Sequence, residues 1–398
     1  MQNSDRMVEL DILRGFAVAM MILVVSPGSW EFYYAPLRHA DWHGWTIADL
    51  VFPDFLFGVG MAMGLTFGAS VDPKQKRRRF WAKVAKRVVA LILLGLALNY
   101  LSVIAGWLGA PSVGPSDVTQ WRIPGILQRI ALCFLLATGI VVLSAGRSSD
   151  GKSLLNPKAI GAAAISILAL YWALMTLVPV PGFGAGDLSQ KGNLAAFIDR
   201  SIFTPQHMWP LAAMEWRGPV LYDPEGLLST LPATANVLFG ILAITIWRRA
   251  AEKREVILLI AGMGLIALAY LLDPLFPINK KIWTSSFALL TSGISFLALL
   301  LVSLLVRYDA VTRWLSVFRV LGGNAILAFS LSMLLSALAA IPLTSGDQPK
   351  NLQAFGYDLA SSIIPDAHLA SLACALAVVA FISTIIWPLD RKGIHLRL

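Results

Sequence analysis

Residues 282–306 read IWTSSFALLTSGISFLALLLVSLLV, a stretch that contains no Asp, Glu, Lys or Arg. It is longer than the roughly 20 apolar residues that a helix needs to cross the hydrocarbon core of a membrane. Nine other stretches have a similar character, so the sequence predicts ten transmembrane helices. They cover residues 8–27, 47–69, 84–106, 124–145, 157–179, 227–247, 254–273, 282–306, 315–340 and 366–388.

The composition agrees with this interpretation. Hydrophobic residues make up 57% of the chain and charged residues 14%, against about 45–50% and about 25% in soluble domains. The net charge of +9 is spread between the apolar stretches, which argues against a nucleic-acid-binding domain. The two cysteines, Cys133 and Cys374, form no CxxC or metal-ligand pattern. We predict an all-α, polytopic integral membrane protein that forms a single domain over residues 1–398.

The distribution of Lys and Arg predicts the orientation. The connections that share a side with the N-terminus, including residues 70–87, contain 22 of these residues, and the opposite set contains eight. Since positive loops stay in the cytoplasm, we expect both termini there and the long loop 180–226 outside. The first stretch lacks the layout of a signal peptide, and we interpret it as a retained helix.

Charged side chains inside the predicted spans are the first candidates for function, because lipid tolerates them poorly. Asp11 and Arg14 lie on one face of the first span. They either form an internal ion pair or bind a cytosolic ligand. Asp49 and Asp54 flank Pro53 near the start of the second span. Proline there favours a broken or late-starting helix whose free backbone groups face a cavity, although Asp49 could equally stabilise the helix N-terminus.

The connection before the second span is rich in titratable and aromatic residues. It reads RHADWHGW over residues 38–45. An aromatic belt at the membrane surface would explain the tryptophans but not the histidines and the aspartate. His39 together with Asp41 or Asp49 resembles a general base with an orienting carboxylate, beside Trp42 and His43. No set of side chains has metal-ligand spacing, so we predict no metal.

Further polar residues are predicted to gather on the extracytoplasmic side. Gln128 and Arg129 lie within RIPGILQR (122–129), and Arg129 must point into the helix bundle. We expect Arg129 to pair with Asp49, Asp54 or a substrate anion. Routine turn and interface chemistry is the alternative for the loop residues. The remaining candidates for substrate binding are Glu225, Asn279, Lys280, Trp283 and Ser285 in the loops, and Asn324 inside the ninth span.

Several of these motifs together resemble one family. HADWHGWTIADLVFP (39–53) resembles the signature of heparan-α-glucosaminide N-acetyltransferase-like membrane acyltransferases and their bacterial relatives. The resemblance continues in order along nearly the whole chain. It includes LDILRGFAVAMMILV (10–24), RIPGILQRIALC (122–133), DPEGLLSTLP (223–232), PINKKIWTSSF (277–287) and GGNAILAF (322–329).

The resemblance implies transfer of an acetyl group from cytosolic acetyl-CoA to the amine of a glucosamine-type sugar on the far side of a bacterial inner membrane. It places the catalytic histidine on His39, as base or transient acetyl carrier, and from the residues themselves we add Asp49 as a catalytic candidate. It also suggests a homodimer. Asp11 and Arg14 are our candidates for binding the acetyl-CoA. The chain departs from the family at Val25-Ser26, where asparagines are expected, and at Asp54, where an aromatic residue is expected.

The same features fit a second class of protein. A permease for an amino sugar, without acyl transfer, would also need charged residues inside the membrane and an interrupted helix. No internal repeat is visible to support it. A purely structural membrane protein has little use for Arg129 and Asp54 inside the bundle.

Overall fold

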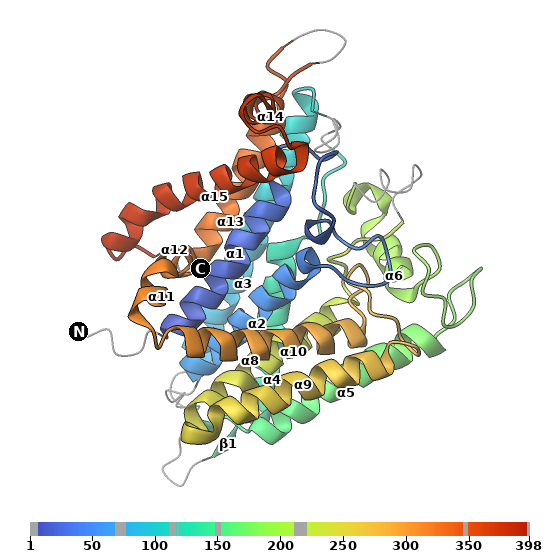
Figure 1. Ribbon diagram of the computed structural model, residues 1–398. Helices are drawn as coiled ribbons and strands as arrows, with labels where there is room; N and C mark the ends of the chain where they lie inside the picture. The colour runs from blue at the N-terminus through green and yellow to red at the C-terminus, as the bar shows by residue number, and fades with distance from the viewer. Residues whose placement is uncertain are drawn as a thin grey trace.

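The computed structural model describes residues 7–67, 77–110, 117, 119–147, 153–210, 221–344 and 349–395. In these ranges the chain is a bundle of helices joined by loops (Figure 1). The helices are α1 (Val8–Val25), α2 (Ile47–Phe67), α3 (Arg77–Trp107), α4 (Ile126–Ser144), α5 (Pro157–Leu177), α6 (Leu194–Phe203), α8 (Thr230–Arg249), α9 (Arg254–Leu272), α10 (Ser285–Leu305), α11 (Asp309–Trp314), α12 (Ser316–Gly323), α13 (Ala325–Ala340), α14 (Leu352–Ile363) and α15 (Ala367–Arg391).

Short elements complete the description. Three 3-10 helices cover Ala35–Leu37, Pro205–His207 and Ala251–Lys253. Two antiparallel strands of two residues each, β1 (Gly146–Arg147) and β2 (Ser153–Leu154), form a small hairpin. The prediction of an all-α membrane protein is therefore confirmed for the part of the chain that the structure describes.

The ten predicted spans all coincide with helices. Within the described ranges, eight helices are long and apolar enough to cross a membrane, and α12 with α13 would add a ninth if the pair acts as one span. Helix α1 carries Glu9, Asp11 and Arg14 within its 18 residues, which lowers its apolar character. Ten spans and cytoplasmic termini stay predictions. The start of α1 and the end of α15 both lie on the left of Figure 1, and the loop between α1 and α2 lies on the right.

The structure adds detail to the predictions for two spans. The segment 315–340 is not one straight helix, because α12 and α13 meet at an 87° bend beside Asn324. In contrast, α2 runs without a break although it contains Pro53. Pro53 has no N–H to donate to the carbonyl of Asp49, so α2 lacks that one bond while the helix continues on both sides of it.

Small residues allow the central helices to pack closely. A Cβ atom on Gly60 of α2 would lie 1.9 Å from the carbonyl oxygen of Val237 in α8, and one on Gly240 would lie 2.1 Å from that of Phe57. Gly322 of α12 packs equally closely on the carbonyl of Asp11 in α1. Such contacts between backbones are typical of helices that associate in membranes. They fix α1, α2 and α8 in the middle of the bundle, and α2 carries the first candidate site residues.

Candidate functional site

The candidate site begins at the N-terminus of α2. Thr46 precedes the helix, and its backbone N–H donates to Asp49 Oδ2 at 2.9 Å. The Ala40 N–H donates to the same oxygen at 3.1 Å, and so does the Thr46 hydroxyl at 3.2 Å. The bond from the Thr46 N–H to the Asp49 side chain is one half of a capping box, in which an acidic residue three positions on binds back to the capping residue. It buries the Asp49 carboxylate and fixes its orientation.

The other carboxylate oxygen binds the histidine. Asp49 Oδ1 lies 2.7 Å from His39 Nδ1. The His39 side chain is 37% exposed, whereas that of Asp49 is fully buried. The bond engages Nδ1 and leaves Nε2 as the nitrogen available to a reactant. Of the two carboxylates that the sequence offered as partners, the structure places Asp49 against the imidazole; Asp41 is exposed.

Lys280 lies close enough to this pair for its charge to act on both His39 and Asp49. Desolvation by the surrounding protein and the nearby Lys280 ammonium lower the pKa of His39, and they outweigh the opposing effect of Asp49. The imidazole is therefore neutral at pH 7, with a lone pair on Nε2 if Nδ1 carries the hydrogen. Burial also lowers the pKa of Lys280 itself, against the pull of Glu225 and Asp49. A neutral imidazole held by a carboxylate is the arrangement that a general base requires.

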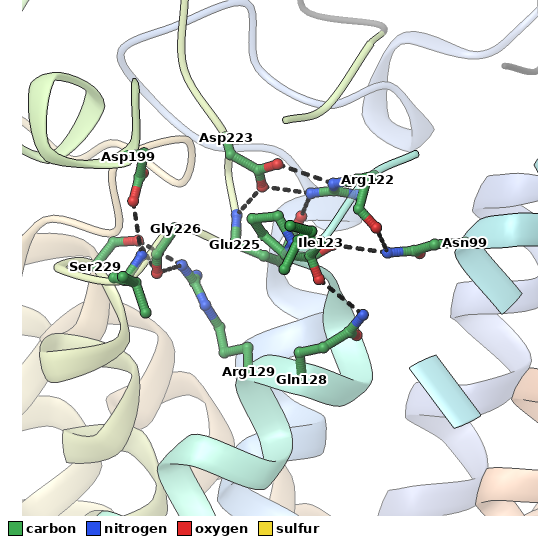
Figure 2. A network of polar contacts seen from close by, with 12 residues as sticks. Asn99, Arg122, Ile123, Gln128, Arg129, Asp199, Asp223, Glu225, Gly226 and Ser229 are labelled. Atoms are coloured by element: carbon green, nitrogen blue, oxygen red, sulfur yellow. Dashed lines mark hydrogen bonds and ion pairs between the residues drawn. The ribbon is translucent and has the colours of Figure 1, made fainter. Parts of the chain in front are cut away.

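A second polar cluster joins the starts of α4 and α8 (Figure 2). Arg122 donates from Nε to Asp223 Oδ2 at 2.9 Å and also pairs with Asp223 Oδ1 and with Glu225. Burial acts against the charge on Arg122, but the two carboxylates raise its pKa overall. Burial alone would raise the pKa of Glu225, yet Arg122, Lys280 and Arg129 hold it at about 2. Glu225 is thus an ionised carboxylate that faces three cations.

Arg129 lies beneath this ion-pair cluster. Its Nη2 donates to the carbonyl of Gly226 at 3.1 Å and to the Ser229 hydroxyl, and its guanidinium carbon lies 5.0 Å from the Trp283 ring centroid. Its Nε and Nη1 are buried and have no hydrogen-bond partner among the described residues. We expected Arg129 to pair with Asp49 or Asp54. In the structure it faces Asp199, Asp223 and Glu225 instead.

Other predicted site residues support the loops. Asn279 is fully buried; its Oδ1 accepts from the Ile282 N–H at 3.1 Å, and its Nδ2 lies 3.5 Å from His43 Nδ1. The Trp42 indole donates to the carbonyl of Leu188 at 3.0 Å. Both side chains shape the loops on either side of His39.

Two residues at the start of α10 face inward. The Ser285 hydroxyl donates to the carbonyl of Leu168 at 2.8 Å. The indole of Trp283, which is completely buried, donates to Asn236 Oδ1 at 3.0 Å. These bonds occupy the donors of both side chains in this structure and tie α10 to α5 and α8.

The remaining predicted residues lie deeper or farther away. Gln128 Nε2 donates to the carbonyl of Ile123, while its Oε1 is buried without a partner among the described residues. Asp54 also has an unpartnered buried oxygen. Asn324 lies at the α12–α13 break and contacts Ile394 and His395 near the end of the chain. It therefore belongs to a different region from the His39 loop.

Asp11 and Arg14 lie on the inner part of α1. Asp11 is buried, and the stem of Arg14 packs against Gly58 of α2. The Arg14 guanidinium is close enough to Arg87 of α3 for the two charges to repel. Arg87 lies 4.6 Å above the Phe134 ring, and its Nε is buried without a partner among the described residues. The cluster of basic residues expected at 74–87 begins outside the described residues, since 68–76 are not described.

Sequence reasoning missed how the site is connected. It noted the charges in RIPGILQR and DPEG but did not pair Arg122 with Asp223, or place Asp199 and Ser229 beside them. The signal was present, because opposite charges directly precede two spans on the same predicted side. Lys281 was also missed as a site residue; it is buried, and its ammonium lies 5.0 Å from the Trp209 ring centroid.

The fold and the site define a class: a polytopic helical membrane protein with a carboxylate-bound histidine at one end. Residues 6–174 match the family model described as heparan-alpha-glucosaminide N-acetyltransferase, catalytic, a segment that includes His39, Asp49 and Arg129. The human heparan-alpha-glucosaminide N-acetyltransferase is 29% identical over 331 residues, which is 74% of this chain and 48% of that protein. The mouse protein of the same name is 27% identical over 335 residues, 75% of this chain and 49% of its own length.

These matches confirm the family resemblance that the motifs predicted. The chain spans about half the length of the curated relatives it matches.

Proposed function

We propose that this protein is a membrane-bound N-acetyltransferase that moves acetyl from cytosolic acetyl-CoA to the amine of a glucosamine-type sugar on the extracytoplasmic side of a bacterial inner membrane. The observation that carries the proposal is the bond between His39 Nδ1 and Asp49 Oδ1. The similarity to the human and mouse enzymes supports the reaction class.

The chemistry follows from the tautomer. Nδ1 of His39 donates to Asp49, so Nε2 accepts a proton from the ammonium form of the sugar amine. The freed amine attacks the thioester carbonyl, a C–N bond forms, and the C–S bond breaks. The proton on Nε2 passes to the departing thiolate of CoA, and Nε2 then takes the second proton from the nitrogen of the new amide and releases it to solvent. In a two-step version, Nε2 itself attacks the thioester and carries the acetyl group to the amine.

The charged neighbours have roles that follow from their placement. Lys280 helps to keep the imidazole neutral and therefore competent as a base. The two unpartnered donors of Arg129, Nε and Nη1, are suited to an oxygen of a bound substrate that reaches this depth. Glu225 is an ionised acceptor that can hold a cationic amine. Asp41, Trp42 and His43 follow His39 in the same loop and are proposed to contact the acceptor.

The donor is proposed to enter from the cytoplasmic side. Arg14 and Arg87 repel each other there, and a phosphate group between them would relieve the repulsion. A small apolar slot lies between α1, α2, α4 and α13 and is lined by Phe52, Phe55 and Ile130 among others. Its volume of about 10 Å³ has room for one water. Side chains in the slot must therefore move before a pantetheine arm can pass.

One experiment tests the proposal directly. Purified protein is incubated with radiolabelled acetyl-CoA and a panel of amino sugars. We expect label to appear in an N-acetylated sugar with wild-type protein, and no label with His39→Ala. If the wild-type protein, like His39→Ala, gives no labelled sugar, the proposal is contradicted. Quenching the reaction without acceptor and measuring acetyl bound to protein separates the one-step from the two-step version.

A permease is the second candidate, because the α12–α13 pair is an interrupted span of the kind that transporters use. Uptake of the amino sugar into vesicles without acyl-CoA would support it. The acetyltransferase proposal expects no such uptake.

A further inference from the structure

Helix α14 lies beside the start of α15, at the end of the bundle that carries the His39 loop (Figure 1). None of its residues is buried. It links α13, one arm of the bent pair, to α15, which is long and apolar enough to cross a membrane. Gln353 Nε2 donates to the carbonyl of Pro27 at 2.7 Å, just beyond the end of α1. This helix therefore lies where α1 ends and α15 begins.

Three rows of side chains divide the surface of α14. Gln353 is in the row that faces the protein, as is Tyr357, which stacks on Phe32 with ring centroids 6.0 Å apart. The second row is polar and exposed, and it consists of Asp358, Ser361 and Ser362. The third row is apolar and exposed, and it consists of Leu352 (58%), Phe355 (42%), Leu359 (67%) and Ile363 (74%). At about 100° per residue, each row lies about a third of a turn from the next.

This division is typical of a helix that lies flat on a membrane. The polar and apolar rows flank the protein-facing row on opposite sides. When such a helix packs sideways against spanning helices, one exposed row points toward lipid and the other toward water. The only charged residue in the sequence 352–363 is Asp358. It lies in the polar row, and its carboxylate accepts from the Lys350 ammonium at 2.6 Å.

The spans next to α14 present apolar side chains of the same kind. On α13, Leu338 lies two residues before the end of the helix and is 52% exposed. On α15, Leu369, Leu376 and Phe381 are 47%, 50% and 52% exposed. Exposed apolar side chains on a spanning helix face acyl chains. The apolar row ends at Ile363, six positions along the chain before Leu369, and so leads into this lipid-facing surface.

We propose that α14 is an interfacial helix whose apolar row, residues 352, 355, 359 and 363, inserts among the acyl chains of the leaflet on the His39 side. The partner is phospholipid. A second copy of the chain is the competing occupant, but four side chains in one row are few against the roughly 20–30 residues a side of a stable protein interface. The inference does not depend on acetyl transfer.

The membrane contact reaches the candidate site through the chain between α1 and α2. Gln353 and Tyr357 of α14 hold residues 27 and 32 of this segment. The Ser371 hydroxyl of α15 accepts from the Ser29 N–H at 3.0 Å and donates to the Ser29 carbonyl at 3.1 Å. His39 follows seven positions after residue 32. The interfacial helix therefore anchors the loop that carries the proposed base.

The test measures the depth of α14 in phospholipid vesicles. The full chain, with Cys133 and Cys374 replaced by alanine, carries one nitroxide, attached at Leu359→Cys. The matched control on the polar row is Ser361→Cys. Oxygen concentrates among acyl chains, whereas a nickel chelate stays in water. We expect the ratio of oxygen to nickel collision rates at residue 359 to exceed that at residue 361 at least about threefold.

Equal ratios at the two positions would overturn the proposal, because the apolar row would then share the environment of the polar row. Low collision rates of both reagents at residue 359, with dipolar coupling between the nitroxides of two copies, would also overturn it. That result would assign the row to a second copy of the chain.

A second measurement needs no substitution. Wild-type protein in the same vesicles is irradiated with a carbene reagent dissolved in the lipid, and the labelled residues are identified by mass spectrometry. We expect label on Leu359 and Ile363 and none on Ser361. Label on Leu376 of α15 without label on the apolar row of α14 would contradict the proposal.

Discussion

Asp49 binds His39 through one carboxylate oxygen, at 2.7 Å, while the other oxygen accepts the N–H groups of Ala40 and Thr46. The same side chain therefore starts helix α2 and orients the proposed base. The bond that Asp49 Oδ2 accepts from the Thr46 N–H holds the carboxylate in place while Oδ1 binds the imidazole.

This double role predicts the behaviour of Asp49→Asn. An amide in place of the carboxylate no longer favours the Nδ1–H tautomer and removes a charge that raises the pKa of His39. We expect kcat to fall by at least about 100-fold. The acid limb in the pH profile of the residual activity, which reports the pKa of His39, should move to lower pH. The measurement is the pH profile of kcat/KM, with Glu31→Gln, a change in an exposed outer-loop carboxylate, as control. Unchanged kcat in Asp49→Asn would contradict the role.

Lys280→Met tests the electrostatics of the same site. The Lys280 ammonium lowers the pKa of His39, so its removal should raise that pKa. Because the base must be neutral, the acid limb of the pH profile of kcat/KM then moves to higher pH. The plateau of that profile falls less than the activity of Asp49→Asn does. Lys350→Met, at an exposed surface ion pair with Asp358, should leave the profile in place. A shift to lower pH in Lys280→Met would rule out this account of Lys280.

The ion-pair cluster predicts a stability effect. Arg122→Met leaves Asp223 and Glu225 buried without their main cation, and loss of one partner of a buried pair costs about 3–5 kcal/mol. We expect a clear loss of thermal stability in detergent. The triple variant Arg122→Met, Asp223→Asn, Glu225→Gln should recover much of it, because no uncompensated charge remains. Equal instability of the single and triple variants would show that packing, not charge, matters there.

Asp199 predicts a stability change that depends on pH. Burial raises its pKa to about 7, whereas an unfolded aspartate titrates near the usual value of about 3.9. The folded state then binds the proton more tightly, so this residue's contribution to stability is full at low pH and is lost as pH rises from about 4 to 7.

Asp199→Asn keeps an oxygen for the Leu227 N–H, which Asp199 Oδ1 accepts at 2.9 Å, and removes the charge. Thermal melts should therefore show a larger gain over wild type at pH 8 than at pH 5. A gain that is larger at pH 5 would have the wrong sign for this explanation.

Donor binding gives a prediction for Arg14. If its guanidinium binds a phosphate of the donor, Arg14→Gln raises KM for acetyl-CoA about tenfold. It should leave KM unchanged for the short thioester S-acetyl-N-acetylcysteamine, which has no phosphate. Arg313→Gln, in an exposed position of α11, is the control. An equal rise in KM for both donors would place Arg14 in a structural role instead.

The helices were predictable because hydrophobic length is a local property of the sequence. The break at Asn324 was not, since residues 315–340 are apolar throughout apart from a few polar side chains. The bend arises where Gly322 packs against the backbone of α1, and that contact depends on the arrangement of the whole bundle. The continuity of α2 through Pro53 was likewise not visible in the sequence, where a proline favours a break.

The site was predictable in its residues and only in part in its contacts. His39 was predicted to be a base from its neighbours, but Asp41 and Asp49 were both open as partners, and the structure places Asp49 against the imidazole. Arg122 and Asp223 lie 101 positions apart, so their ion pair depends on how α4 and α8 are placed.

The most direct test of the central claim is acetyl transfer by His39→Ala. The purified variant is first checked for folding by its thermal melt, and then assayed with radiolabelled acetyl-CoA and glucosamine beside wild-type protein. The account predicts a wild-type-like melt with transfer reduced by at least about 100-fold. Transfer at the wild-type rate by a folded His39→Ala protein would contradict it.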